Sequence, residues 1–180
     1  MKKICITFLL LFIIFLTVGC SGFNSSGINS AETEYLRIHV RANSNEDCDQ
    51  SVKYIIKDAV VNFLTPYISN CQSKDDTAKV IETKIRDIEY IIDRILHSKG
   101  FKYTSKVCIK NEKFPSRVYD GITLESGYYD AVIVYLGEGK GDNWWCVVYP
   151  PLCFTGTENV IYRSKILEII AEFKEKYLSR

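Results

Sequence analysis

The chain has 180 residues, 47% of them hydrophobic, and carries 23 basic against 22 acidic side chains. This length predicts one domain with a sizeable core. The even charge balance, without clusters of Lys and Arg, excludes a basic nucleic-acid-binding domain, so no nucleic acid is expected among the partners.

The first 20 residues have the layout of an export signal. Lys2 and Lys3 precede an apolar run over residues 4–18, and small residues follow it. This run is shorter than the roughly 18 to 20 residues of a membrane-spanning helix, which favours a cleaved leader over the alternative of an uncleaved anchor. The sequence therefore predicts an exported, extracytoplasmic protein.

Cys20 is a candidate for lipidation. Gly19 precedes it, as in lipoprotein signals, but Thr17 stands where such signals usually carry Leu. The alternative is ordinary cleavage near Gly19 or Gly22. The leader or a lipid on Cys20 would each provide a means of membrane association.

Residues 21–34 are rich in Ser, Asn and Gly, which is typical of a flexible tether, and residues 35–180 are expected to form a single domain. Its first element is a strand from Tyr35 to Arg41, because apolar and polar side chains alternate strictly there. One face is apolar, with Leu36, Ile38 and Val40. The other face is basic, with Arg37, His39 and Arg41.

Two amphipathic helices are predicted next. Asp47 and Gln50 have the spacing of a capping box at the start of the first helix, which is expected to stop near Pro66. Isoleucines at alternating steps of three and four predict a second helix that begins after Ser73 and ends at Gly100.

The second half of the chain predicts three strands and a closing helix. Residues 101–109 alternate with period two, as in an amphipathic strand near a sheet edge. Residues 128–136 and 144–149 are apolar on both faces, as in central strands, and are joined by a hairpin-like link across residues 137–143. Residues 162–177 have helical periodicity. The order predicts an α/β protein of the α+β type, with a mixed sheet of about four strands covered by about three helices.

Five cysteines follow the leader, so at least one is unpaired or pairs between chains. Export would permit disulfides. Cys146 and Cys153 are the best candidate pair, because Pro150 and Pro151 force the chain to bend between them.

Catalytic and metal sites have weaker support. A cysteine hydrolase would pair Cys146 with His39, although an apolar strand is a poor setting for a thiolate. Zinc needs four ligands, and the only histidines are His39 and His97, so no metal or other cofactor is predicted. Residues 137–142 resemble a phosphate-binding loop, but Gly follows Lys140 and no helix comes next, so a turn is expected.

The two tryptophans and the basic strand face are the candidate partner contacts. Adjacent residues of a strand point to opposite faces, so one tryptophan is expected in the core and the other in the core or as a partner anchor. The basic face either meets a partner carboxylate or is solvated. The candidates are Asn143, Trp144, Trp145, Arg37, His39 and Arg41.

Two segments carry a resemblance to a known family. Residues 137–154, GEGKGDNWWCVVYPPLCF, and residues 36–44, LRIHVRANS, together resemble the stage II sporulation protein R family. The resemblance extends from Tyr35 to Phe154, about two thirds of the chain. The chain departs from the family pattern at Glu46, Cys48 and Tyr149.

The resemblance implies an exported signalling protein of endospore formation. It would be made in the forespore and act in the space between the forespore and mother-cell membranes. There it would activate a membrane-embedded sporulation aspartic protease that processes the pro-form of mother-cell sigma factor E. The resemblance supplies no catalytic residue, so a ligand is expected rather than an enzyme, with an exported cysteine-dependent hydrolase or cell-wall-active enzyme as the alternative.

Overall fold

The computed structural model describes residues 34–119, 121–156 and 159–179. The leader, Cys20 and residues 21–33 of the predicted tether lie outside this range. The described elements are β1 (Leu36–Arg41), α2 (Asp47–Ile68), α3 (Lys74–Ser98), β2 (Ser105–Phe114), β3 (Arg117–Tyr119), β4 (Ile122–Leu124), β5 (Gly127–Leu136), β6 (Asn143–Tyr149) and α4 (Val160–Leu178).

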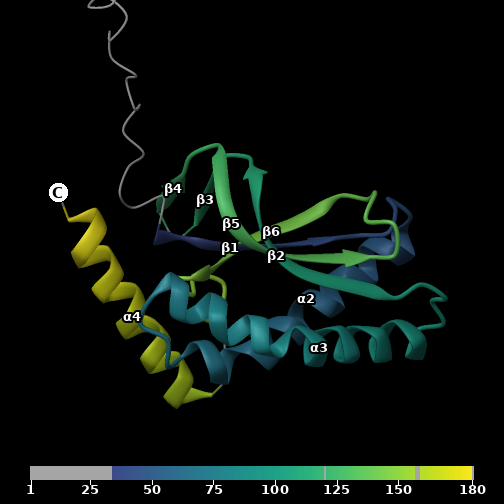
Figure 1. Ribbon diagram of the computed structural model, residues 1–180, viewed down its shortest axis with the longest axis horizontal. Helices are drawn as coiled ribbons and strands as arrows, with labels where there is room; N and C mark the ends of the chain where they lie inside the picture. Colours follow the sequence, from purple (N-terminus) through teal and green to yellow (C-terminus); the bar gives the residue numbers. More distant parts are fainter. Residues whose placement is uncertain (1–33, 120, 157–158, 180) are drawn as a thin grey trace, which may run out of the picture.

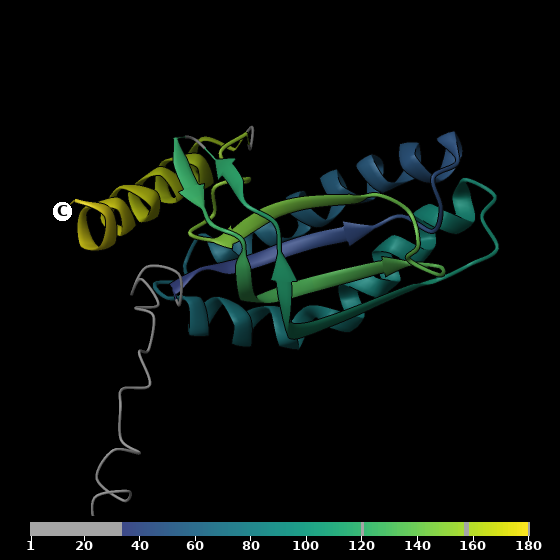
Figure 2. The same ribbon diagram turned by 90° about the horizontal axis from the view of Figure 1, so that it is seen from above.

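Four strands form a mixed sheet in the order β2-β5-β1-β6. β1 runs parallel to β5 and antiparallel to β6, and β2 is antiparallel to β5. Helices α2 and α3 lie against one face of the sheet, and the β3–β4 hairpin rises from the opposite face near one end (Figures 1 and 2). This arrangement confirms the predicted α+β class with a mixed four-stranded sheet and three helices.

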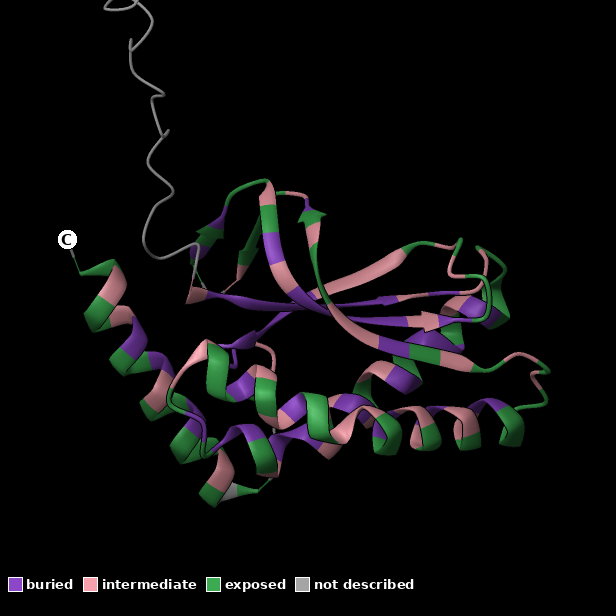
Figure 3. Ribbon diagram, viewed as in Figure 1, coloured by how far each residue is buried: buried purple, intermediate pink, exposed green. Residues whose placement is uncertain are grey.

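The alternation in β1 explains the position of the core. Leu36, Ile38 and Val40 are each 0% exposed. They face the buried sides of α2 and α3, whose outer sides are exposed to solvent (Figure 3). Helix α4 packs at one end of the sheet, where Phe173 lies 5.0 Å from the ring of Tyr35.

The expected pairing of the last two strands is wrong. β5 and β6 do not form a hairpin, because β1 lies between them: Ile38 is opposite Val132 on one side and Cys146 on the other. β6 is therefore an edge strand of the sheet. The connection over residues 137–142 crosses the end of β1, where the Gly141 amide donates to the Ala42 carbonyl at 2.9 Å. A long-range pairing of this kind leaves no local sequence pattern.

Two further strand predictions need correction. β2 begins at Ser105 and not at residue 101, because Gly100 takes a left-handed φ of 84° and the Asp93 carboxylate accepts the Ser105 amide at 2.7 Å. β2 is an edge strand, as predicted. Strands β3 and β4 were not predicted, since three residues each are too few for a period-two pattern.

Helix α2 also differs from its prediction at both ends. Its N-cap is Glu46 without a side-chain cap, and Gln50 donates instead to the Ser44 carbonyl at 2.9 Å. The helix continues through Pro66 to Ile68, because a proline in the last turn removes only one hydrogen bond. Helix α3 begins after Ser73 as predicted, with the Ser73 hydroxyl accepting the Asp76 amide at 3.1 Å.

Candidate partner-binding face

The sheet face opposite α2 and α3 brings most of the candidate contact residues together. β1 contributes Arg37, His39 and Arg41, and the neighbouring β6 places Asn143 opposite Arg41 and Trp145 opposite His39. These five residues form what we call the basic strip. About a hundred residues separate the two segments in the sequence, so their proximity depends on the β1–β6 pairing.

The basic strip is not the solvated surface that one interpretation of the sequence expected. Arg37 and His39 are 0% exposed, whereas Arg41 is half-buried. Aromatic side chains of β2, β3, β5 and β6 cover them. Phe114 and Trp145 both stack beside the His39 ring, with centroids 5.2 and 4.6 Å away.

Three aromatic rings surround the side chain of Arg37. Its guanidinium carbon is 4.3 Å from the Phe114 centroid, 4.9 Å from that of Tyr129 and 5.6 Å from that of Tyr119. Nη2 donates to the Tyr119 hydroxyl at 2.9 Å. Within the described residues Arg37 forms no ion pair. Burial lowers its pKa, and the nearby positive charge of Arg117 adds to this effect, which the Tyr119 hydroxyl opposes.

His39 and Arg41 share one carboxylate. The Nε2 atom of His39 lies 3.2 Å from a Glu112 oxygen, and the Arg41 guanidinium pairs with the other oxygen. Burial and the Arg41 charge lower the pKa of His39 to about 4, against the opposing effect of Glu112. The imidazole is therefore neutral at pH 7, and its Nε2–H donates to Glu112.

The other face of β6 carries the one remaining candidate, Trp144. Trp144 is opposite Val40, on the helix side, with the Lys57 ammonium 5.6 Å from its ring. The two tryptophans thus point to opposite faces, as predicted, but both are half-buried and neither is fully in the core.

The predicted disulfide between Cys146 and Cys153 is confirmed, with Cα atoms 6.3 Å apart. Cys146 is opposite Ile38, so it faces the helices while His39 faces the other way. The thiol is bonded and the imidazole is on the opposite side of the sheet. These two residues therefore do not form the nucleophile–base pair that a cysteine hydrolase would need.

Reducing this disulfide is expected to lower the free energy of unfolding by about 2.5 kcal/mol, since the bond closes a loop of about eight residues. Urea denaturation with and without a thiol reductant measures the difference. The double variant C146S/C153S serves as the control and should show no response to reductant. An equal response in both proteins would assign the effect to disulfides that Cys48, Cys71 or Cys108, which are unpaired in this structure, form between chains.

A polar network that the sequence did not reveal fixes the loops beside the basic strip. Asp49, only 4% exposed, accepts hydrogen bonds from Asn43 at 2.8 Å, Ser44 at 2.6 Å and the Tyr103 hydroxyl at 2.5 Å. The glycine-rich connection packs directly on this network. A Cβ on Gly141 would lie 2.1 Å from the Ser44 carbonyl oxygen, so close backbone approach accounts for this glycine.

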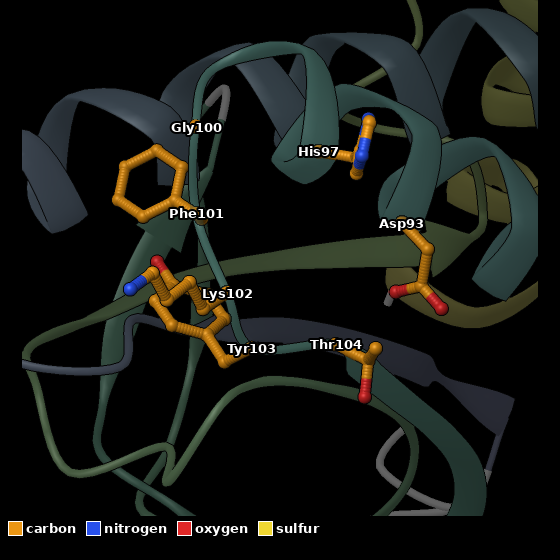
Figure 4. Close-up of a pocket in the computed structure, with 7 residues that line it drawn as sticks. All are labelled: Asp93, His97, Gly100, Phe101, Lys102, Tyr103 and Thr104. Carbon is orange, nitrogen blue, oxygen red and sulfur yellow. The ribbon is translucent and has the colours of Figure 1, made fainter.

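A surface pocket lies between the end of α3 and the segment leading into β2 (Figure 4). Its polar groups have structural roles. Asp93 accepts the Ser105 amide and hydroxyl at 2.7 and 2.8 Å, and His97 is exposed in the last turn of α3. The lining residues are Asp93, His97, Gly100, Phe101, Lys102, Tyr103 and Thr104. No catalytic arrangement follows from them.

Across the described part of the chain, no helix combines the length and apolar character needed to cross a membrane. The same residues contain no group of three or more His, Cys, Asp and Glu side chains placed to hold a metal ion.

Comparison with known proteins agrees with the resemblance. The family model described as Stage II sporulation protein R (spore_II_R) matches residues 32–159. Stage II sporulation protein R of Bacillus subtilis (strain 168) is 34% identical over 124 residues, which are 69% of this chain and 55% of that relative. The chain thus spans about half the length of the curated relative it matches, and no solved structure matches it. The extent of these matches shows that the chain belongs to the stage II sporulation protein R family, a family of sporulation proteins.

Proposed function

We propose that this protein is an exported signal of endospore formation. It is made in the forespore and acts between the forespore and mother-cell membranes. There it activates the membrane-embedded aspartic protease that processes the pro-form of mother-cell sigma factor E. Membership of the stage II sporulation protein R family carries this proposal. The export-type leader, with or without a lipid on Cys20, supports the location.

The proposed mechanism is that of a ligand. A domain bound to the extracytoplasmic side of the protease shifts an inactive population towards an active one, and it does so only through a higher affinity for the active state. The basic strip is the proposed contact surface, because its side chains alternate with those of β1 that face α2 and α3, and because Arg41, Asn143 and Trp145 are partly exposed there. Because the strip lies on two paired strands, its backbone is already ordered, and this lowers the entropic cost of binding.

Co-expression in a non-sporulating host tests the proposal. The full chain with its leader is produced beside the membrane protease and the sigma factor precursor, and precursor cleavage is scored by gel. Cleavage should appear only when this chain is present. Equal cleavage in a host that lacks only this chain, with its export verified in the first host, would refute the signalling function.

A further inference from the structure

The buried polar atoms without a partner all lie on the basic strip. In the part of the chain that the structure describes, five buried side-chain nitrogen or oxygen atoms have no hydrogen-bond partner: Arg37 Nε and Nη1, His39 Nδ1, Arg41 Nε and Asn143 Oδ1. Native proteins satisfy the great majority of such atoms. Their concentration on two neighbouring strands therefore indicates a site that a polar ligand completes when the aromatic rings over it move aside.

The chemistry of these atoms indicates which ligand. The three guanidinium nitrogens are donors, and they suit carboxylate oxygens. The other two are acceptors, because neutral His39 donates from Nε2 to Glu112 and keeps a lone pair on Nδ1, while Asn143 presents an amide oxygen. An inorganic anion would satisfy the donors alone. A peptide segment with acidic side chains supplies both carboxylates and backbone N–H groups.

The charge of this sheet face favours the same ligand. By strand alternation, the face carries Arg37, Arg41, Lys106 and Lys110 against the single carboxylate of Glu112. Both lysines are exposed. A partner segment with several acidic side chains would therefore be attracted to it and held in register.

The spacing of the two arginines predicts the spacing of the acids. Arg37 and Arg41 are four residues apart on one strand, which separates them by about 13 Å. A single carboxylate cannot reach both, whereas an extended segment can present acidic side chains at positions i and i+4. Arg41 is half-buried, whereas Arg37 is fully buried, so the partner carboxylate would reach Arg41 first, beside the ion pair of Arg41 with Glu112. Arg37 becomes available when the Tyr119 side chain, also half-buried, gives up its hydroxyl contact.

We propose that the basic strip binds an extended acidic peptide segment of a protein partner, with carboxylates at Arg41 and Arg37 and backbone N–H groups at His39 and Asn143. The identity of the partner as the sporulation protease rests on the proposed function. The acidic-peptide site itself does not depend on it.

Peptide titration followed by NMR tests the site. The full-length ¹⁵N-labelled protein in mild detergent is titrated with Ac-Glu-Ser-Thr-Ser-Glu-NH2, and with the matched peptide in which Gln replaces both Glu. The acidic peptide should shift the arginine Nε–H and Trp145 indole resonances, with an affinity that falls as salt is added. Equal shifts with the Gln peptide, or no shift with either, would overturn the proposal and assign the partnerless atoms to bound water.

Matched variants locate the binding. R41Q should weaken the acidic peptide at least fivefold, whereas R86Q, which removes the same charge from the exposed side of α3, should leave its affinity unchanged. An equal loss of peptide affinity in both variants would show that only the overall charge of the protein matters, and would contradict a specific site.

The variant R37M separates binding from folding. A guanidinium that is buried without an ion pair is costly to desolvate, so R37M should keep a Tm equal to or above that of the natural chain while it no longer binds the acidic peptide. A lower Tm with unchanged peptide affinity would make Arg37 a structural residue and refute its role at the site. If R37M does not fold, R37K keeps the charge without the planar fork and should bind the peptide more weakly.

The co-expression assay keeps this inference separate from the proposed function. If R41Q weakens peptide binding but supports as much precursor cleavage by the protease as the natural chain does, the basic strip is removed from the signalling contact. Peptide binding by the natural chain without any cleavage would refute the proposed function and leave the acidic-peptide site intact.

Discussion

Replacing Asp49 with alanine is expected to lower the free energy of unfolding by about 4 kcal/mol, because three hydrogen bonds to a buried charged group are lost together. Asn43, Ser44 and Tyr103 donate these bonds from two separate loops. Burial alone would raise the pKa of Asp49, but the three hydrogen bonds outweigh it and hold the pKa below its usual value. At neutral pH the carboxylate is thus charged and accepts all three hydrogen bonds.

Urea denaturation of D49A and of D47A measures this effect. Asp47 is exposed in the same first turn of α2, so D47A removes the same charge from the helix N-terminus without touching the network. The control should lose less than about 1 kcal/mol. Similar losses in the two variants would show that the helix dipole, and not the Asp49 network, determines the stability of this end of the fold.

His39 should make the fold sensitive to mild acid. Its pKa is lowered from 6.5 to about 4 in the folded protein, chiefly by burial and then by the Arg41 charge. Glu112 opposes this shift and the Lys110 charge adds to it. Above pH 6.5 the ring is neutral in both the folded and the unfolded states. As the pH falls from 6.5 towards 4, the unfolded chain binds a proton that the folded chain does not, so the free energy of unfolding decreases, by up to roughly 3 kcal/mol.

The variant H39Q isolates this contribution. Unfolding free energies of the natural chain and of H39Q are measured between pH 7.5 and pH 4, and the difference between the two proteins is plotted against pH. Carboxylates such as Asp49 titrate in both proteins, so their contributions to the pH dependence largely cancel in the difference. The difference in unfolding free energy should not depend on pH above 6.5. Below pH 6.5 the natural chain should lose stability relative to H39Q. A flat difference over the whole range would show that protonated His39 is accommodated in the fold.

The sequence predicted local structure well where a pattern was long and regular. The alternation in residues 35–41 identified β1, and the isoleucine spacing identified α3 with both of its ends. It failed where distant segments decide the outcome. Nothing local to residues 128–149 shows that β1 separates β5 from β6, because pairing is set by the packing of the whole sheet.

The candidate face illustrates the same limit. Strand alternation placed Arg37, His39 and Arg41 on one side, but it could not show that rings from β2, β3, β5 and β6 cover two of them. Only the three-dimensional structure shows that the basic strand face is largely buried. Natural sequences tend to break the rules of folding at functional sites, and this supports the proposal that the basic strip is the contact surface.

Site-specific photo-crosslinking tests most directly whether the basic strip contacts the protease. A benzoylphenylalanine residue replaces Lys110, exposed on the strip face, or Arg86, exposed on α3, and each variant is co-expressed with the membrane protease. Both variants must first support precursor cleavage. We predict a crosslink to the protease from position 110 and none from position 86. A crosslink from position 86 alone would place the contact on the helical side and contradict the assignment of the basic strip.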